Sequence, residues 1–161
     1  MKGSILLFLL VFGCTVNATE QIPEEFNVDG AKFEIDERPL ESFISNEDFH
    51  KKINPSMCSA SWRGYKGYWA LRNKKLVLDV LVKNACSNKF NPIEANELFK
   101  DSHYPLIATW FTGKINVRIG ERKFFDTKAT GLSGVQFEAV VYEFQSGELA
   151  SRSIEIVEVR W

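Results

Sequence analysis

The stretch that decides the fold is SWRGYKGYWALRNKKLVLDVLV, which covers residues 61–82. Its two ends, residues 61–71 and 75–82, are rich in aromatic and aliphatic side chains, whereas residues 72–74 are polar. This pattern predicts two antiparallel strands joined by a tight turn. With the turn centred at 72–74, residues whose numbers sum to about 144 to 147 would face each other across the hairpin.

Two cysteines flank this hairpin. The numbers of Cys58 and Cys86 sum to 144, so we expect both residues near the open end of the hairpin, within reach of a bridge. A disulfide there would constrain the unfolded chain by roughly 3 kcal/mol. Two buried free thiols are the alternative interpretation.

Two more hairpins are predicted downstream. One joins residues 106–111 to 114–119, and the other joins 135–145 to 148–159, each across a two-residue turn that contains glycine. The first alternates between an apolar and a mixed face, as expected of a half-buried antiparallel sheet. The second has apolar residues on both faces, which indicates a bulge or a strand buried on both sides.

Helical signals are few. Ser45 or Asn46 can cap a helix over residues 47–53, and proline at the first position favours a helix over residues 92–99. A short strand is expected at 32–35. The fold class we predict is therefore α+β and β-rich, an antiparallel curled sheet or small barrel built from three hairpins with two short helices.

The N-terminus has the features of a secretory signal peptide, which we place at residues 1–18. Cleavage after Ala18 would release a soluble protein. Residues 11–14 also resemble a bacterial lipobox, in which case Cys14 would be lipidated. Both alternatives predict an extracytoplasmic mature chain, in the periplasm or secreted, with a single globular domain over residues 19–161.

Charge is balanced overall but unevenly spread. The 161 residues include 20 Lys+Arg and 21 Asp+Glu, a net charge of −1, which argues against an extended nucleic-acid surface. Residues 20–48 carry a net −8, and residues 50–128 carry a net +9. An acidic N-terminal arm (19–48) and a basic body could serve a charged partner; alternatively, the arm folds back onto the body.

No pattern of reactive residues indicates catalysis. His50 and His103 lie outside any metal-ligand spacing, so neither a metal site nor a cofactor is predicted. Motifs for a nucleophile elbow or a phosphate-binding loop do not occur. Glu138 and Glu143 on one predicted strand, and Asp79 within an apolar run, are the acids that an envelope hydrolase could use, with Asp79 as a tuned general acid. We favour the simpler interpretation that Asp79 lies on a solvated strand face.

The most distinctive local feature is a strand segment that interleaves aromatic residues with cations and glycines. Such a surface could stack on a ligand or anchor a protein partner. A tightly curved strand whose aromatic residues fill the core is the alternative. The candidate binding residues are Trp62, Arg63, Tyr65, Lys66, Tyr68 and Trp69.

Several segments resemble a motif pattern of small bacterial proteins of uncharacterised function. They are WRGYKGYWALRNKKLVLDVL (62–81), ELF (97–99), PLIATWFTGKINVRIGE (105–121) and VVYEFQSGEL (140–149). The pattern combines a W-R-G-Y-x-x-x-W strand with a W-[FY]-[ST]-G hairpin. The resemblance marks a family but implies no activity.

These observations predict an exported, non-catalytic binding module, concretely a periplasmic inhibitor or immunity-type protein. Its expected partner is a protein of the cell envelope, with no nucleic acid, and with membrane contact only through a lipid at Cys14. The alternatives are a small β-barrel carrier of an apolar ligand and an envelope lipoprotein with a structural or accessory role.

Overall fold

The computed structural model of the protein describes residues 21–87, 89–127 and 132–160. The predicted signal peptide, with Cys14, lies outside the described residues. In chain order the elements are β1 (Glu24–Val28), β2 (Ala31–Ile35), a 3-10 turn (Pro39–Ser42), α1 (Asn46–Ile53), β3 (Tyr65–Arg72), β4 (Lys75–Lys83), β5 (Pro92–Ile93), α2 (Ala95–Leu98), β6 (Leu106–Ile107), β7 (Gly113–Arg118), β8 (Lys123–Thr127), β9 (Leu132–Gln145) and β10 (Glu148–Arg160).

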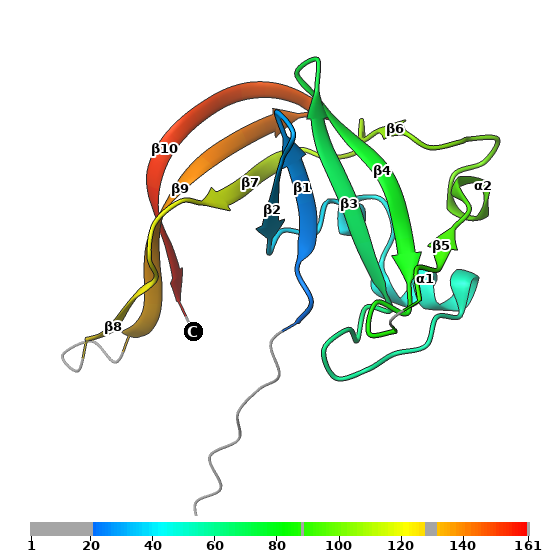
Figure 1. Ribbon diagram of the computed structural model, residues 1–161, viewed down its shortest axis with the longest axis horizontal. Coiled ribbons are helices and arrows are strands. Elements are labelled where there is room, and N and C mark those ends of the chain that lie inside the picture. The colour runs from blue at the N-terminus through cyan, green and yellow to red at the C-terminus, as the bar shows by residue number, and fades with distance from the viewer. Residues whose placement is uncertain (1–20, 88, 128–131, 161) are drawn as a thin grey trace, which may run out of the picture.

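Within the described residues, ten strands form one mixed sheet with the main order β2-β1-β3-β4-β10-β9-β7. Strands β5 and β6 add to β4, and β8 adds to β9. Only β1 and β3 run parallel among these pairs. The sheet curls so that β10, β9 and β7 form an arch over β1 and β2, while α1 and α2 lie beside the β3–β4 hairpin (Figure 1). The prediction of a β-rich α+β fold with a curled sheet is confirmed.

The hairpin predicted from residues 61–82 is present as β3 and β4. Arg72 pairs with Lys75, so the turn consists of Asn73 and Lys74. Both turn residues have positive φ, 50° and 61°, which is the two-residue turn that matches the twist of the flanking strands. A bulge after Tyr68 shifts the register by one residue along the rest of the hairpin.

Cys58 and Cys86 form the predicted disulfide, with their Cα atoms 6.6 Å apart. The bridge joins two loops, not two paired strand positions. Cys58 lies in a small turn that ends at Ser61, before β3 begins, and Cys86 lies in the loop after β4. The disulfide therefore fixes the loops at the open end of the central hairpin.

The predicted hairpin between residues 106–111 and 114–119 is wrong. Strand β6 pairs with β4, and β7 pairs with β9. Residues 108–111 form a turn, closed by the Phe111 N–H donating to the Ala108 carbonyl at 2.9 Å. Both segments do contain a strand, as their apolar alternation indicates. They pair with different strands, β6 with β4 and β7 with β9, and not with each other.

The β9–β10 hairpin is confirmed, including a bulge between Leu149 and Ser151. A further hairpin comes from the acidic N-terminal segment. There β1 pairs with β2, with Phe26 opposite Phe33, and β1 also joins β3. The predicted short strand at 32–35 therefore exists, and the acidic segment is an integral part of the sheet.

Of the two predicted helices, one is confirmed and one is displaced. Ser45 is the N-cap of α1, as expected. The predicted helix over 92–99 is wrong in its first turn, because Ile93 is fully buried and extends β5 against β4. The helix begins only after Glu94, which forms a reciprocal capping box with Glu97.

Large side chains from the strands, from α1, from the 3-10 turn and from the segment before β3 fill the interior of the curled sheet. The largest of those less than 2% exposed include Trp69, Arg63, Tyr65, Phe26, Phe49, Phe144, Ile35, Leu40, Leu76 and Leu78. The edge strands β2 and β7 approach each other without pairing, so the sheet stays open along one seam. In the part of the chain that the structure describes, no helix has the length and apolarity needed to cross a membrane.

Candidate functional site

The structure divides the six candidate binding residues between two environments. Successive side chains of a strand point to opposite faces, so a continuous aromatic segment cannot form one surface. Lys66 and Tyr68 lie half-buried on the outer face, and Trp62 precedes the strand, 45% exposed. The remaining three, Arg63, Tyr65 and Trp69, are buried.

The buried three surround a carboxylate that the sequence analysis did not select. Glu24 of β1 is fully buried, and the Trp69 indole N–H donates a hydrogen bond to it. Arg63 lies 3.8 Å from the same carboxylate and donates to the Ile22 carbonyl at 2.6 Å. Burial raises the pKa of Glu24 to about 7, against the opposing effects of Trp69 and Arg63. This cluster joins β1 to β3 and is closed to a partner.

Glycine at position 67 makes this cluster possible. A Cβ on Gly67 would lie 2.5 Å from both Glu24 Oε2 and Trp69 Nε1. The glycine of this strand therefore marks a close approach of side chains. Tyr65 lies at the same cluster, and burial raises the pKa of its hydroxyl far above the ordinary value. The segment thus has a structural function on its inner face.

The outer face carries the feature we call the outer hollow. It is a depression of about 240 Å³ lined by Lys66, Tyr68, Val82, Ala85, Ser87, Lys89 and Phe90. The Tyr68 and Phe90 rings meet edge to face, with centroids 6.4 Å apart, and Lys66 Nζ lies 5.2 Å from the Tyr68 centroid. Phe90 is 67% exposed.

One wall of the outer hollow is the loop that follows β4. The disulfide at Cys86 fastens this loop. Asn84 adds two more attachments: its N–H donates to the Gly64 carbonyl at 3.1 Å, and its side-chain oxygen accepts from the Ser56 N–H at 2.7 Å. On the far side of Phe90, the Lys83 N–H donates to the Asn91 carbonyl at 2.9 Å, so the loop is attached to the fold both before and after this residue.

The charge of the outer hollow is positive. Lys66 and Lys89 line it, and none of the described residues that line it is acidic. Lys32 of the nearby β2 is paired with Glu25 at 3.0 Å and so adds no net charge. Two aromatic rings between cations suit a partner that combines an apolar group with negative charge.

Trp62 is not part of the outer hollow. Its backbone N–H donates to the Gln21 side chain, and the Arg38 guanidinium lies 5.6 Å from its ring centroid. The structure thus places Trp62 with residues of the N-terminal segment. Trp62 and Arg38 thus form a separate cation–π pair on the surface.

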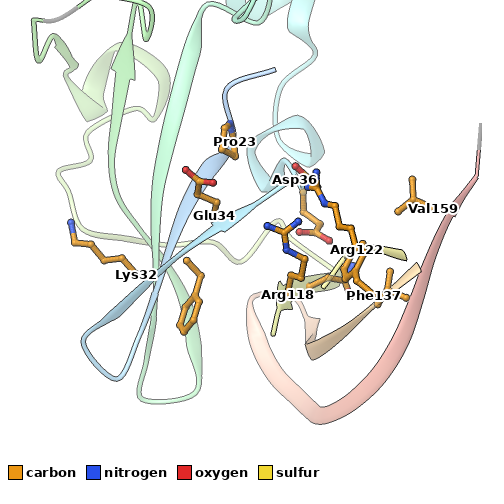
Figure 2. Close-up of a pocket in the computed structure, with 12 residues that line it drawn as sticks. Pro23, Lys32, Glu34, Asp36, Arg118, Arg122, Phe137 and Val159 are labelled. Carbon is orange, nitrogen blue, oxygen red and sulfur yellow. Dashed lines mark hydrogen bonds and ion pairs between the residues drawn. The ribbon is translucent and has the colours of Figure 1, made fainter. Parts of the chain in front are cut away.

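A second depression of about 280 Å³ lies at the seam between β2 and the arch (Figure 2). In it Arg118 and Arg122 lie beside Asp36, opposite an apolar wall that includes Phe137 and Val159. Asp36 and Arg122 are 4.0 Å apart. The seam therefore has mixed charge, with acid and base facing each other across the gap.

One carboxylate ties the two edges of this seam together. Glu37 accepts a hydrogen bond from the Asn116 side chain at 2.5 Å. Burial raises the pKa of Glu37, and hydrogen bonds from its own N–H and from Asn116 oppose that effect. The contact spans the β2 and β7 sides of the open sheet. We assign it a structural function.

The acids considered for hydrolysis are not brought together. Asp79 on β4 is paired with Arg72 at 2.8 Å; burial raises its pKa, and Arg72 opposes this. Glu138 is exposed on β9. His50 is engaged with the Arg63 carbonyl at 2.9 Å, and the described residues contain no group of three or more metal-ligating side chains.

Comparison of the chain with protein-family models, with curated proteins and with solved structures gave no significant match. The two depressions differ in their chemistry. Of these, the outer hollow combines one exposed and one half-buried aromatic ring with two lysines and a loop fastened by a disulfide.

Proposed function

We propose that the protein is an exported, non-catalytic binding module of the bacterial cell envelope, and that it binds a protein partner at the outer hollow. The supporting observation is Phe90, which stands 67% exposed beside Tyr68 on a loop fastened by a disulfide. Disulfides persist in oxidising compartments, which agrees with the export expected from the N-terminal sequence.

The chemistry of the hollow indicates what part of a partner it would accept. Phe90 and Tyr68 offer apolar surface, and Lys66 and Lys89 offer cations at its rim. An acidic segment that carries one apolar or aromatic side chain would bury that side chain and pair its carboxylates. A periplasmic inhibitor or immunity-type protein is the concrete form of this proposal.

The carrier alternative has less support. Carriers keep an internal cavity for their ligand. Here the described interior is occupied by side chains such as Trp69, Phe26 and Phe144, all no more than 1% exposed. Both depressions of the surface described above are shallow and open outward.

The proposal is tested by affinity capture from the envelope fraction with three purified baits. The wild type should retain a discrete partner, and the double variant Lys66→Glu with Phe90→Ser should lose it. Arg118→Glu, a charge reversal at the seam, is the control and should retain the partner. If all three baits captured the partner equally, the outer hollow would not be the binding surface. If no bait captured a stoichiometric partner, the binding function itself would be contradicted.

A further inference from the structure

Strand β10 has one long unpaired edge. It pairs with β9 along almost its whole length, but among the described residues its pairing with β4 is confined to Glu148 opposite Lys75. Residues 151–160 thus leave about 30 Å of edge open to another strand. This edge follows the outer rim of the arch (Figure 1). Exposed edges of this length are templates for strand addition.

The side chains along this edge follow a symmetric pattern. Arg152, Ile154, Ile156 and Glu158 alternate along β10 and therefore share one face of the sheet. Ile154 and Ile156 are 65% and 64% exposed. Two neighbouring exposed isoleucines at an open edge favour association unless a partner covers them. Arg160 shares this face, and its guanidinium lies 2.7 Å from the Glu158 carboxylate. The partner must therefore suit two apolar residues flanked by Arg152 on one side and by the Glu158–Arg160 pair on the other.

We infer that this edge pairs with the same edge of a second copy of the chain, antiparallel and centred on Glu155, to form a homodimer with a continuous sheet. In this register Arg152 lies opposite Glu158 of the second copy, and Ile154 lies opposite Ile156. The two-fold symmetry repeats both pairs. The pairing runs from Ser151 to Val159, so it uses nearly the whole free edge.

Neighbouring registers lose this complementarity. Centring the pairing on Ile156 would place Arg152 opposite Arg160 of the second copy and Ile154 opposite Glu158. Centring it on Ile154 would place Arg152 opposite an isoleucine. Because like charges directly opposite each other are destabilising and opposite charges are stabilising, the charge pattern selects the proposed register.

The other face of the sheet must accommodate two Glu155 side chains at the symmetry axis. Each Glu155 lies 3.5 Å from Lys114, which reaches it across β9. The axis would then carry a row of lysine, glutamate, glutamate and lysine. Ser153 and Val157 flank this row and lie opposite each other across the two copies. The two lysines offset the repulsion between the central carboxylates.

Sedimentation equilibrium of the mature protein over about two orders of magnitude in concentration tests this inference. We expect a monomer–dimer equilibrium for the wild type. Arg152→Glu and Glu158→Arg should each raise the dimer dissociation constant at least about tenfold, because each variant creates two like-charge pairs. An equimolar mixture of the two variants should restore dimers, since every pair in the heterodimer is again of opposite sign.

Lys123→Glu on β8 is the matched control and should leave the dimer unchanged; circular dichroism checks that all variants are folded. A wild type that stays monomeric throughout would overturn the inference. Dimers that tolerate both single variants, or single variants whose mixture stays monomeric, would also overturn it, because the interface or the register would then be different.

Discussion

The indole N–H of Trp69 in β3 donates a hydrogen bond to the carboxylate of Glu24 in β1, across 45 positions of the chain. This contact connects the acidic N-terminal segment to the central hairpin. It lies in the same buried cluster as Arg63. The contact also separates the two faces of the aromatic segment: its inner face holds the sheet together, and Lys66 and Tyr68 of its outer face are partly exposed.

Replacing Gly67 by alanine should destabilise the protein by about 2 to 3 kcal/mol, because the new methyl group would displace the Glu24 and Trp69 side chains. Urea denaturation measures this loss. Gly30→Ala is the control: it has open space around it but a φ of +82°, so it should cost only about 1 kcal/mol. If Gly67→Ala lost no more stability than Gly30→Ala, the close approach of Glu24 and Trp69 to Gly67 would be contradicted.

The stability of the protein should depend on pH through Glu24. Its pKa in the folded protein is about 7, above the ordinary 4.5, so folding favours the protonated form. The resulting stabilisation is complete below pH 4.5 and is lost as the pH rises through 7. The free energy of unfolding should therefore fall by up to about 3 kcal/mol over this range, relative to Glu24→Gln. Parallel pH profiles for the two proteins would exclude this assignment.

Removing the disulfide with Cys58→Ser and Cys86→Ser should lower the free energy of unfolding by about 3 kcal/mol, because the bridge closes a loop between residues 28 positions apart. Reductant should produce the same loss in the wild type and none in the double variant. A double variant as stable as the oxidised wild type would show that the loops at the open end are held by their hydrogen bonds alone.

Phe90→Ser should leave the fold almost unchanged, because the ring is mostly exposed and its ring contact with Tyr68 is edge to face. We expect a change in unfolding free energy within about 0.5 kcal/mol. Phe49→Ser, at a fully buried position of α1, is the contrasting control and should lose several times more. A large loss for Phe90→Ser would mean that the exposed ring supports the fold and is not reserved for a partner.

The parts of the fold that could be predicted from sequence are those set by local patterns. The polar turn at 72–74 determines the β3–β4 hairpin, and Ser45 determines the start of α1. By contrast, the alternation in 106–111 indicates a strand but does not say which strand it joins. The pairing of β1 with β3 depends on the burial of Glu24, one of a group of acidic residues that predicted an arm for a charged partner, or one folded back onto the body.

The candidate site was predictable only in part, for a similar reason. Lys66 and Tyr68 were selected as part of an aromatic strand, but the sequence does not say which face of that strand meets the core. Phe90 and Lys89 belong to a loop with no strand or helix pattern. The signal in the sequence was the Cys58–Cys86 pair. A bridge between these cysteines holds the loop after β4 near the start of β3, and Phe90 in that loop then lies beside Tyr68.

The most direct test of binding at the outer hollow is site-specific photocrosslinking in living cells. A benzoylphenylalanine in place of Phe90 in the full chain should give a light-dependent adduct of one defined mass, while the same group in place of Phe43, an aromatic residue exposed elsewhere, should not. An adduct at position 90 alone is the predicted result. No adduct at position 90, or the same adduct from both positions, would contradict the proposal that a partner binds at the outer hollow.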